Sequence, residues 1–147
     1  MTVLDAYAVI ALLRAEPAAT EVDVLLERGD AALTAVGVGE VLDHLIRLVG
    51  VNEEEAALDV AQLGLLDGTS VTAALGGAAG RLRARHYHRT RCAVSMADCV
   101  AAETARTLGE ALATSDPHLL DVCLAEGISS IVLPQSDGSV WAASTGT

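Results

Sequence analysis

Residues 1–13 read MTVLDAYAVIALL, an apolar run in which Asp5 carries the only charge. The segment TVLD is typical of a short β-branched strand, and the residues from Ala6 to Arg14 have the apolar periodicity of a helix. Asp5 therefore lies where a first strand passes into a first helix. A lone ionised carboxylate is costly to bury unless a hydrogen bond, an opposite charge or a metal compensates it. The position predicts a partner elsewhere in the chain.

The composition bounds the class of protein. A chain of 147 residues is expected to form one domain, with a core of Ala, Val, Leu and Ile because the sequence has no Phe and few other aromatic residues. No apolar run approaches the roughly 20 residues that span a bilayer, and the N-terminus lacks the basic region of a signal peptide. We therefore expect a cytoplasmic protein that does not contact a membrane.

The three cysteines, Cys92, Cys99 and Cys123, are an odd number without C-x-x-C spacing. This pattern argues against a disulfide framework and against a zinc site. We expect them to be small buried hydrophobic residues.

The charge is unevenly spread. The formal net charge of −11 disfavours nucleic-acid binding in general, yet the nine basic residues are all arginines and five of them lie in RLRARHYHRTR, residues 81–91. This run is either a solvated helix end and loop or a local patch for an anionic ligand. Its arginines are Arg81, Arg83, Arg85, Arg89 and Arg91.

Along the chain, short β-branched runs alternate with segments of helical period. Strands are predicted at residues 2–5, 31–34, 111–114 and 130–133, with a weaker one at 70–73 after a turn at Asp67-Gly68. Helices are predicted at residues 6–14, 18–28, 38–49, 53–65, 73–85, 95–108 and 117–125. The alternation predicts an α/β fold, a short parallel sheet flanked by helices on both faces. Residues 1–133 form this domain, and residues 134–147 are expected to be a mobile polar tail.

Four acidic residues lie at or near a strand-to-helix transition or in the first turns of a helix: Asp5, Glu40, Asp98 and Asp116. In an open parallel sheet, the carboxyl ends of the strands and the adjacent helix N-termini share one edge, where ligands bind. The four carboxylates are therefore expected to converge.

Each acid alone has a local structural explanation. Asp5 and Asp116 fit helix N-caps, Ser95 with Asp98 fits a capping box, and Glu40 fits a solvent-facing helix position. Together, four acids at one edge repel each other unless a cation lies among them. Oxygen ligands without His or Cys favour Mg²⁺ or Mn²⁺. Such a centre activates water and suits hydrolysis of a phosphodiester.

The segments VLDAYAVIALL, VGVGEVLDHLI, VSMADCVAAETA and ALATSDPHLL resemble the four acidic motifs of PIN domains, in the same order. The resemblance covers Thr2 to Leu133 and is greatest to the toxins of VapBC toxin-antitoxin pairs. It implies a Mg²⁺- or Mn²⁺-dependent endoribonuclease that dimerises and is silenced by a cognate antitoxin.

Residue by residue, the resemblance implies that Asp5, Glu40, Asp98 and Asp116 are the catalytic, metal-binding acids, with Ser95 and Thr114 as supporting hydroxyls. Tyr7 departs from the family pattern, because a Ser or Asn often stands two residues after the first Asp.

The acidic edge cannot attract RNA unaided. The five arginines of residues 81–91 are therefore candidates for RNA phosphate contacts. An antitoxin arm is expected to present a cation to the acidic pocket.

Alternatives remain. A haloacid-dehalogenase-like phosphatase needs a second Asp where Tyr7 stands, and a response-regulator receiver needs a late Lys, which this chain lacks. The main alternative is a catalytically inactive PIN-like protein that serves as a binding partner.

Overall fold

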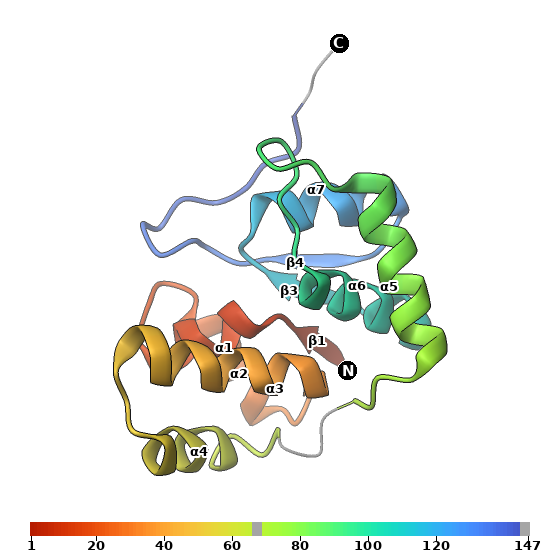
Figure 1. The fold of residues 1–147 in the computed structure, drawn as a ribbon. Helices are drawn as coiled ribbons and strands as arrows, with labels where there is room; N and C mark the ends of the chain where they lie inside the picture. Colours follow the sequence, from red (N-terminus) through yellow and green to blue (C-terminus); the bar gives the residue numbers. More distant parts are fainter. Residues whose placement is uncertain (66–68, 145–147) are drawn as a thin grey trace.

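The fold, seen in a computed structural model that describes residues 1–65 and 69–144, is built on one parallel sheet (Figure 1). Its strands are β1 (Thr2–Leu4), β2 (Ala31–Leu33), β3 (Leu112–Thr114) and β4 (Ser130–Val132). They lie in the order β2-β1-β3-β4, and every pairing is parallel. The predicted parallel α/β class is confirmed, with β1 and β3 as the central pair.

The helices follow the predicted order, with shifted ends. They are α1 (Ala6–Leu13), α2 (Ala19–Glu27), α3 (Ala35–Asp43), the π-helix η1 (His44–Val49), α4 (Glu53–Ala61), α5 (Ala73–His86), α6 (Met96–Leu108) and α7 (Pro117–Glu126). Within the described residues, none of them is long and apolar enough to cross a bilayer.

The helix predicted at residues 38–49 differs most from expectation. It begins at Ala35, because the Thr34 side chain accepts a hydrogen bond from the Gly37 N–H at 2.9 Å and caps the helix three residues earlier. Its second half is the π-helix η1, which ends at Gly50 with a left-handed φ of 87°. The helix predicted at 53–65 ends earlier, at Ala61.

The weak strand predicted at residues 70–73 is wrong. Thr69 makes only an isolated parallel bridge with Thr34. Thr72 instead caps α5 by accepting a hydrogen bond from the Leu75 N–H at 3.1 Å. Because a capping threonine fixes where a helix begins, Ala73 is the first residue of α5 and does not belong to a strand. The turn predicted at Asp67-Gly68 lies outside the described residues.

The sheet separates two hydrophobic cores. Because side chains alternate along a strand, Leu4 packs into a core built with α1 to α4, while Val3 packs into a core built with α5, α6 and α7. Helices therefore cover both faces of the sheet, as predicted. Cys99 and Cys123 are buried in the second core, where burial raises the pKa of each thiol to about 12. All three cysteines are free.

The C-terminal segment after β4 has no regular secondary structure within residues 134–144. The Trp141 indole N–H donates to Asp121 Oδ1 at 3.0 Å, which places this part of the segment against α7. The mobility expected of residues 134–147 stays a prediction.

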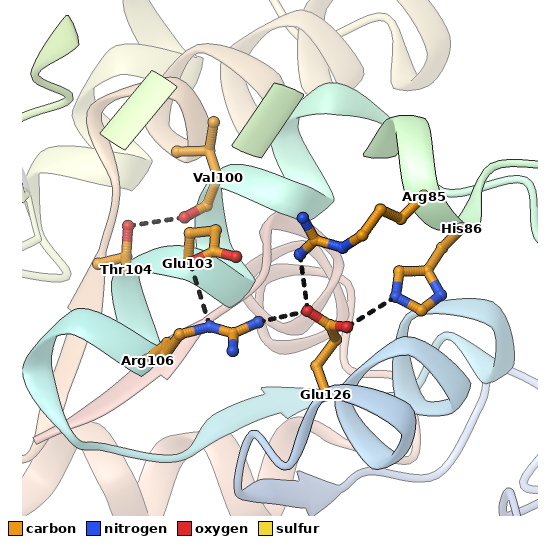
Figure 2. Close-up of polar contacts among 7 residues, drawn as sticks. All are labelled: Arg85, His86, Val100, Glu103, Thr104, Arg106 and Glu126. Carbon is orange, nitrogen blue, oxygen red and sulfur yellow. Dashed lines mark hydrogen bonds and ion pairs between the residues drawn. The ribbon is translucent and has the colours of Figure 1, made fainter. Parts of the chain in front are cut away.

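An ion-pair cluster around Glu126 joins the three helices of the second core (Figure 2). Arg85 from α5 and Arg106 from α6 donate to Glu126 Oε1 at 2.8 and 2.7 Å. His86 Nε2 lies 3.0 Å from Oε2 of the same carboxylate, and Arg106 also pairs with the buried Glu103 at 3.2 Å. The hydrogen bonds from His86, Arg85 and Arg106 lower the pKa of Glu126 to about 2.

Glu126→Gln tests this cluster. A carboxyl whose pKa falls on folding stabilises the protein above its ordinary pKa, near 4.5 here, and loses that stabilisation as the pH falls toward 2. We expect the variant to lose about 1 kcal/mol of unfolding free energy at pH 7, since both arginines are partly exposed and screened. Between pH 4.5 and 2, its stability in denaturant titrations should fall less steeply than that of the wild type.

Asp43→Asn is the matched control, because Asp43 pairs with Arg47 on the open surface of the helix. Arg47 also lowers the pKa of Asp43, but both side chains are exposed and screened, so this variant should depart from the wild-type stability curve much less than Glu126→Gln does. If the unfolding free energy of Glu126→Gln changed with pH from 4.5 to 2 as steeply as that of the wild type, the ionised carboxylate of Glu126 would not stabilise the ion-pair cluster.

Candidate active site

Asp5 lies at the end of β1 and is almost completely buried. Its Oδ1 accepts the Ala8 N–H at 2.8 Å, which caps α1, and its Oδ2 accepts the hydroxyl of Thr114. Burial raises the pKa of Asp5 to about 7, against the two hydrogen bonds, which lower it. The charges of Asp98 and Asp116 raise it further. Thr114, at the end of the neighbouring strand, is the partner predicted from the sequence, because its hydroxyl compensates the burial of the Asp5 carboxylate.

Thr114 connects two of the predicted acids. It is fully buried, and its Oγ1 both donates to Asp5 and accepts the Asp116 backbone N–H at 3.0 Å. This hydroxyl therefore adds a side-chain link to the backbone hydrogen bonds that join the ends of β1 and β3. The side chain of Asp5 is held by contacts from α1 and β3.

Asp98 and Asp116 are held by the helices that they begin. Asp116 Oδ1 accepts the His118 N–H at 2.8 Å at the start of α7. Asp98 Oδ2 accepts the Ser95 N–H at 2.9 Å, and Ser95 Oγ accepts the Asp98 N–H at 3.0 Å, which completes a capping box. The capping roles predicted for Asp5, Asp98 and Asp116 are confirmed. They leave one carboxylate oxygen of Asp98 and one of Asp116 without a hydrogen bond from the described residues, whereas both oxygens of Asp5 are hydrogen-bonded.

Glu40 comes from α3 and is half-buried. Burial raises its pKa, and the neighbouring charges of Asp98 and Asp43 add to that effect. The pKa of Asp98 is likewise raised by burial and by the charge of Asp116. The charges of Asp98 and Asp116 thus reach Asp5, and the charge of Asp98 reaches Glu40, so the four acids lie along one negative edge of the sheet.

Several carboxylate oxygens at this edge receive no hydrogen bond from the described residues: Asp98 Oδ1, Asp116 Oδ2 and both oxygens of Glu40. No fully buried side-chain N or O in residues 1–65 and 69–144 lacks a partner, so these free oxygens are reached by solvent. The donors are all carboxylate oxygens, which Mg²⁺ and Mn²⁺ prefer.

The side chains do not form a closed metal cage. Within the part of the chain that the structure describes, no three His, Cys, Asp or Glu side chains lie close enough together to hold an ion. Mg²⁺ commonly uses one or two carboxylates and keeps several waters. The chemistry of the donor set therefore fits a hard divalent ion.

A hollow of about 370 Å³ opens beside Asp116, and Tyr7, Arg14 and His44 also line it. A smaller hollow of about 130 Å³ contains Glu40 and shares Tyr7 and His44 with the first. Sequence reasoning missed Tyr7 and Arg14 as residues of the site. Tyr7 lies on α1 and Arg14 directly follows its last residue, so their spacing of seven places both on one side of this helix and was the available signal.

The arginine run of residues 81–91 divides into two groups. Arg83 Nε donates to the Val94 carbonyl at 2.9 Å and its guanidinium lies 4.2 Å from the centre of the Tyr87 ring, while Arg85 is paired with Glu126. Arg81, Arg89 and Arg91 are exposed.

Arg89 and Arg91 belong to a short turn closed by an antiparallel bridge between His88 and Cys92. The Ala93 N–H donates to His118 Nδ1 at 3.0 Å, which ties the end of this turn to the start of α7 beside Asp116. The two exposed arginines therefore lie on a loop near the acidic edge.

Comparison with known proteins agrees with this architecture. The PIN domain family model matches residues 2–124. None of the curated proteins searched matches the chain.

Several solved structures share the fold at low sequence identity. FitAcB from Neisseria gonorrhoeae is 19% identical, with a TM-score of 0.63 over 88% of this chain and 96% of that chain. VapBC2 from Rickettsia felis, solved bound to a DNA fragment from their promoter, is 14% identical, with a TM-score of 0.64 over 88% and 96%. PAE2754 from Pyrobaculum aerophilum is 18% identical, with a TM-score of 0.56 over 82% and 83%.

Thr114→Val tests the hydroxyl that joins Asp5 to Asp116. The substitution keeps the shape of the side chain but leaves a buried carboxylate oxygen and a backbone N–H without their partner. We expect it to lower the unfolding free energy by roughly 1–3 kcal/mol, whereas Thr114→Ser should retain most of the stability. Chemical denaturation measures the difference.

The matched control is Thr104→Val, at an equally buried threonine whose hydroxyl donates only to the Val100 carbonyl one helical turn earlier (Figure 2). Its loss should be about 1 kcal/mol or less, because such bonds within a helix contribute little. Equal losses at both threonines would argue against a special role for Thr114.

Proposed function

The chain belongs to the PIN domain family, and from that premise we propose that it is a Mg²⁺- or Mn²⁺-dependent endoribonuclease, the toxin of a toxin-antitoxin pair. PIN domains are generally metal-dependent nucleases. The observation that carries the proposal is the placing of four carboxylates along the carboxyl edge of the central strands, where the pKa values of Asp5, Glu40 and Asp98 are raised.

In this proposal Asp5, Glu40, Asp98 and Asp116 hold the ion, one or two of them directly and the others through water, because no three of these side chains lie close enough to bind it together within the described residues. A bound divalent ion lowers the pKa of a water molecule and offsets charge on the leaving oxygen of a phosphodiester. The chain's own contribution is to fix the ligands before substrate arrives. Thr114 and the Ala8 N–H fix Asp5, and helix caps fix Asp98 and Asp116, so little side-chain freedom remains to be lost on binding.

RNA must approach this edge against its negative charge, so cations beside it matter. Arg14 lines the larger hollow together with Asp116, and it is exposed. We propose Arg14, Arg81, Arg89 and Arg91 as phosphate contacts. Arg83 and Arg85, which the sequence also suggested, already bind the Val94 carbonyl and the Glu126 carboxylate.

The proposed partners are a cognate antitoxin and a second copy of the chain. The VapBC2 structure, which shares this fold, was solved as a complex on promoter DNA. With a net charge of −11, this chain itself suits DNA poorly, so in our proposal the antitoxin carries the DNA-binding part. An arm of that antitoxin would inhibit by placing a cation among the four acids.

The alternative function is a PIN-like binding partner without catalysis. Two features favour it: Tyr7 occupies a position where the family often has a Ser or Asn, and three of the four acids serve as helix caps. Cleavage of RNA with added Mn²⁺ separates the two functions.

Cleavage of single-stranded or looped RNA should require Mg²⁺ or Mn²⁺ and stop in EDTA. Asp5→Asn and Asp116→Asn should each reduce the rate by more than the roughly 10- to 100-fold that losing a partner of a metal ligand costs. Their thermal stability without metal should equal or slightly exceed that of the wild type. Asn caps a helix as well as Asp and removes one charge from a repelling cluster.

Asp23→Asn on the exposed side of α2 is the control, since it removes one charge away from this edge and should cleave normally. If the Asp116→Asn variant cleaved RNA at the wild-type rate, Asp116 would serve only as a helix cap. Full activity in EDTA would show that the acids do not hold a catalytic metal.

Arg14→Ala should weaken RNA binding and lower the slope of log K against log salt by about 0.7, the contribution of one phosphate contact on a single strand. Arg28→Ala is the control, because Arg28 is an exposed arginine at the end of α2 that does not line either hollow. Binding titrations at several salt concentrations measure both. An unchanged slope for Arg14→Ala would remove Arg14 from the RNA contacts.

A further inference from the structure

Tyr7 is the residue of the acidic edge to which the proposed catalysis gives no role. It is the second residue of α1, two residues after Asp5, and 57% of it is exposed. The chain has only three aromatic residues of the Phe, Trp and Tyr kinds. One of these three aromatic side chains is therefore exposed beside the four carboxylates.

The Tyr7 ring is held in place from one side. His44 contacts it edge-to-face, with ring centroids 5.8 Å apart and an interplanar angle of 75°. The α-helix α3 changes into the π-helix η1 at His44. A π-helix is wider than an α-helix, and this change alters which side chains follow Glu40 on the same helix face. The contact orders the ring while most of it remains open to solvent.

The Tyr7–His44 pair also separates the two hollows. On one side lie Asp116 and Arg14, and on the other lie Glu40 and Arg47. A flat apolar surface thus stands between carboxylates of the metal-binding set, with an arginine in each hollow. Arg14 is free to meet a phosphate, whereas Arg47 is paired with Asp43 at 2.8 Å.

This arrangement matches the chemistry of a nucleotide in a single strand. Such a nucleotide offers an exposed base face to an aromatic ring, while its flanking phosphates reach charged groups on either side. A base inside a duplex is already stacked on both faces and has none to offer. The geometry therefore discriminates between paired and unpaired RNA.

We propose that Tyr7, positioned by His44, stacks an unpaired base of single-stranded RNA next to the phosphodiester at the four carboxylates, and so selects unpaired RNA. The inference rests on the proposed ribonuclease function and names the part of that substrate which the edge recognises.

The experiment compares Tyr7→Phe, Tyr7→Leu and Tyr7→Ala. Binding is measured in an Asp116→Asn background with Mn²⁺, so that the RNA stays intact, using a short single-stranded RNA that carries one 2-aminopurine and the same RNA in a duplex. Cleavage kinetics are measured with Asp116 present. Leu58→Ala is the matched control, because Leu58 is also 57% exposed but lies on α4 and lines neither hollow.

Tyr7→Phe should bind the single strand within about twofold of the parent and retain 2-aminopurine quenching. Tyr7→Leu and Tyr7→Ala should bind roughly 5- to 100-fold more weakly and lose the quenching, because each loses a stacking face. His44→Ala should show a smaller loss of both. The duplex should bind weakly, and with equal affinity, to all variants. All variants should have the melting temperature of the parent, and Leu58→Ala should also bind the single strand as tightly as the parent does.

Single-strand binding and cleavage unaffected by Tyr7→Ala would overturn the inference while leaving the ribonuclease proposal intact, and would assign the ring to contact with a protein partner. Equal binding by Tyr7→Leu and Tyr7→Phe would also overturn it, because a merely apolar contact does not need a ring. A wild type that neither binds nor cleaves RNA would overturn both proposals.

Discussion

The hydrogen bond from the Thr114 hydroxyl to the buried carboxylate of Asp5 is the contact on which the candidate site depends. Asp5 ends β1, Thr114 ends β3, and the same hydroxyl accepts the N–H of Asp116. One side chain therefore links two acids at the ends of two strands that are already paired through their backbones. Without it, the buried carboxylate of Asp5 would keep only the hydrogen bond from the Ala8 N–H, at a higher cost of burial.

Helix capping and metal binding are compatible uses of these acids, although the sequence pattern presents them as alternatives. A cap occupies one oxygen of Asp98 and one of Asp116, and leaves the second oxygen of each without a protein donor among the described residues. Helix N-termini carry partial positive charge, which makes a concentration of carboxylates more tolerable before any cation arrives. The caps thus help to assemble the negative edge that a divalent ion would neutralise.

The distribution of arginines reflects two different needs. Arg85 and Arg106 are partly exposed and form ion pairs with Glu126, their shared partner, which joins three helices on one face of the sheet (Figure 2). Arg14, Arg89 and Arg91 stay exposed near the acidic edge. A strongly acidic protein that is to handle RNA needs such local cations, because its overall field repels the phosphate backbone.

Residue patterns alone were enough to predict the alternation of strands and helices and the capping roles of Asp5, Asp98 and Asp116, whereas a metal site formed by these acids and Glu40 stays a prediction. Periodicity and caps act over three or four residues, and a parallel sheet brings its carboxyl ends to one edge. The same local reasoning failed at residues 70–73, where Thr72 starts a helix instead of continuing a strand. Only the tertiary structure decided that Thr114 meets Asp5, 109 residues away, that Arg85 pairs with Glu126, 41 residues away, and that His44 orders Tyr7. Sequence patterns mark which face of each element is buried, whereas contacts between polar or exposed side chains depend on how distant elements are oriented once both cores have packed.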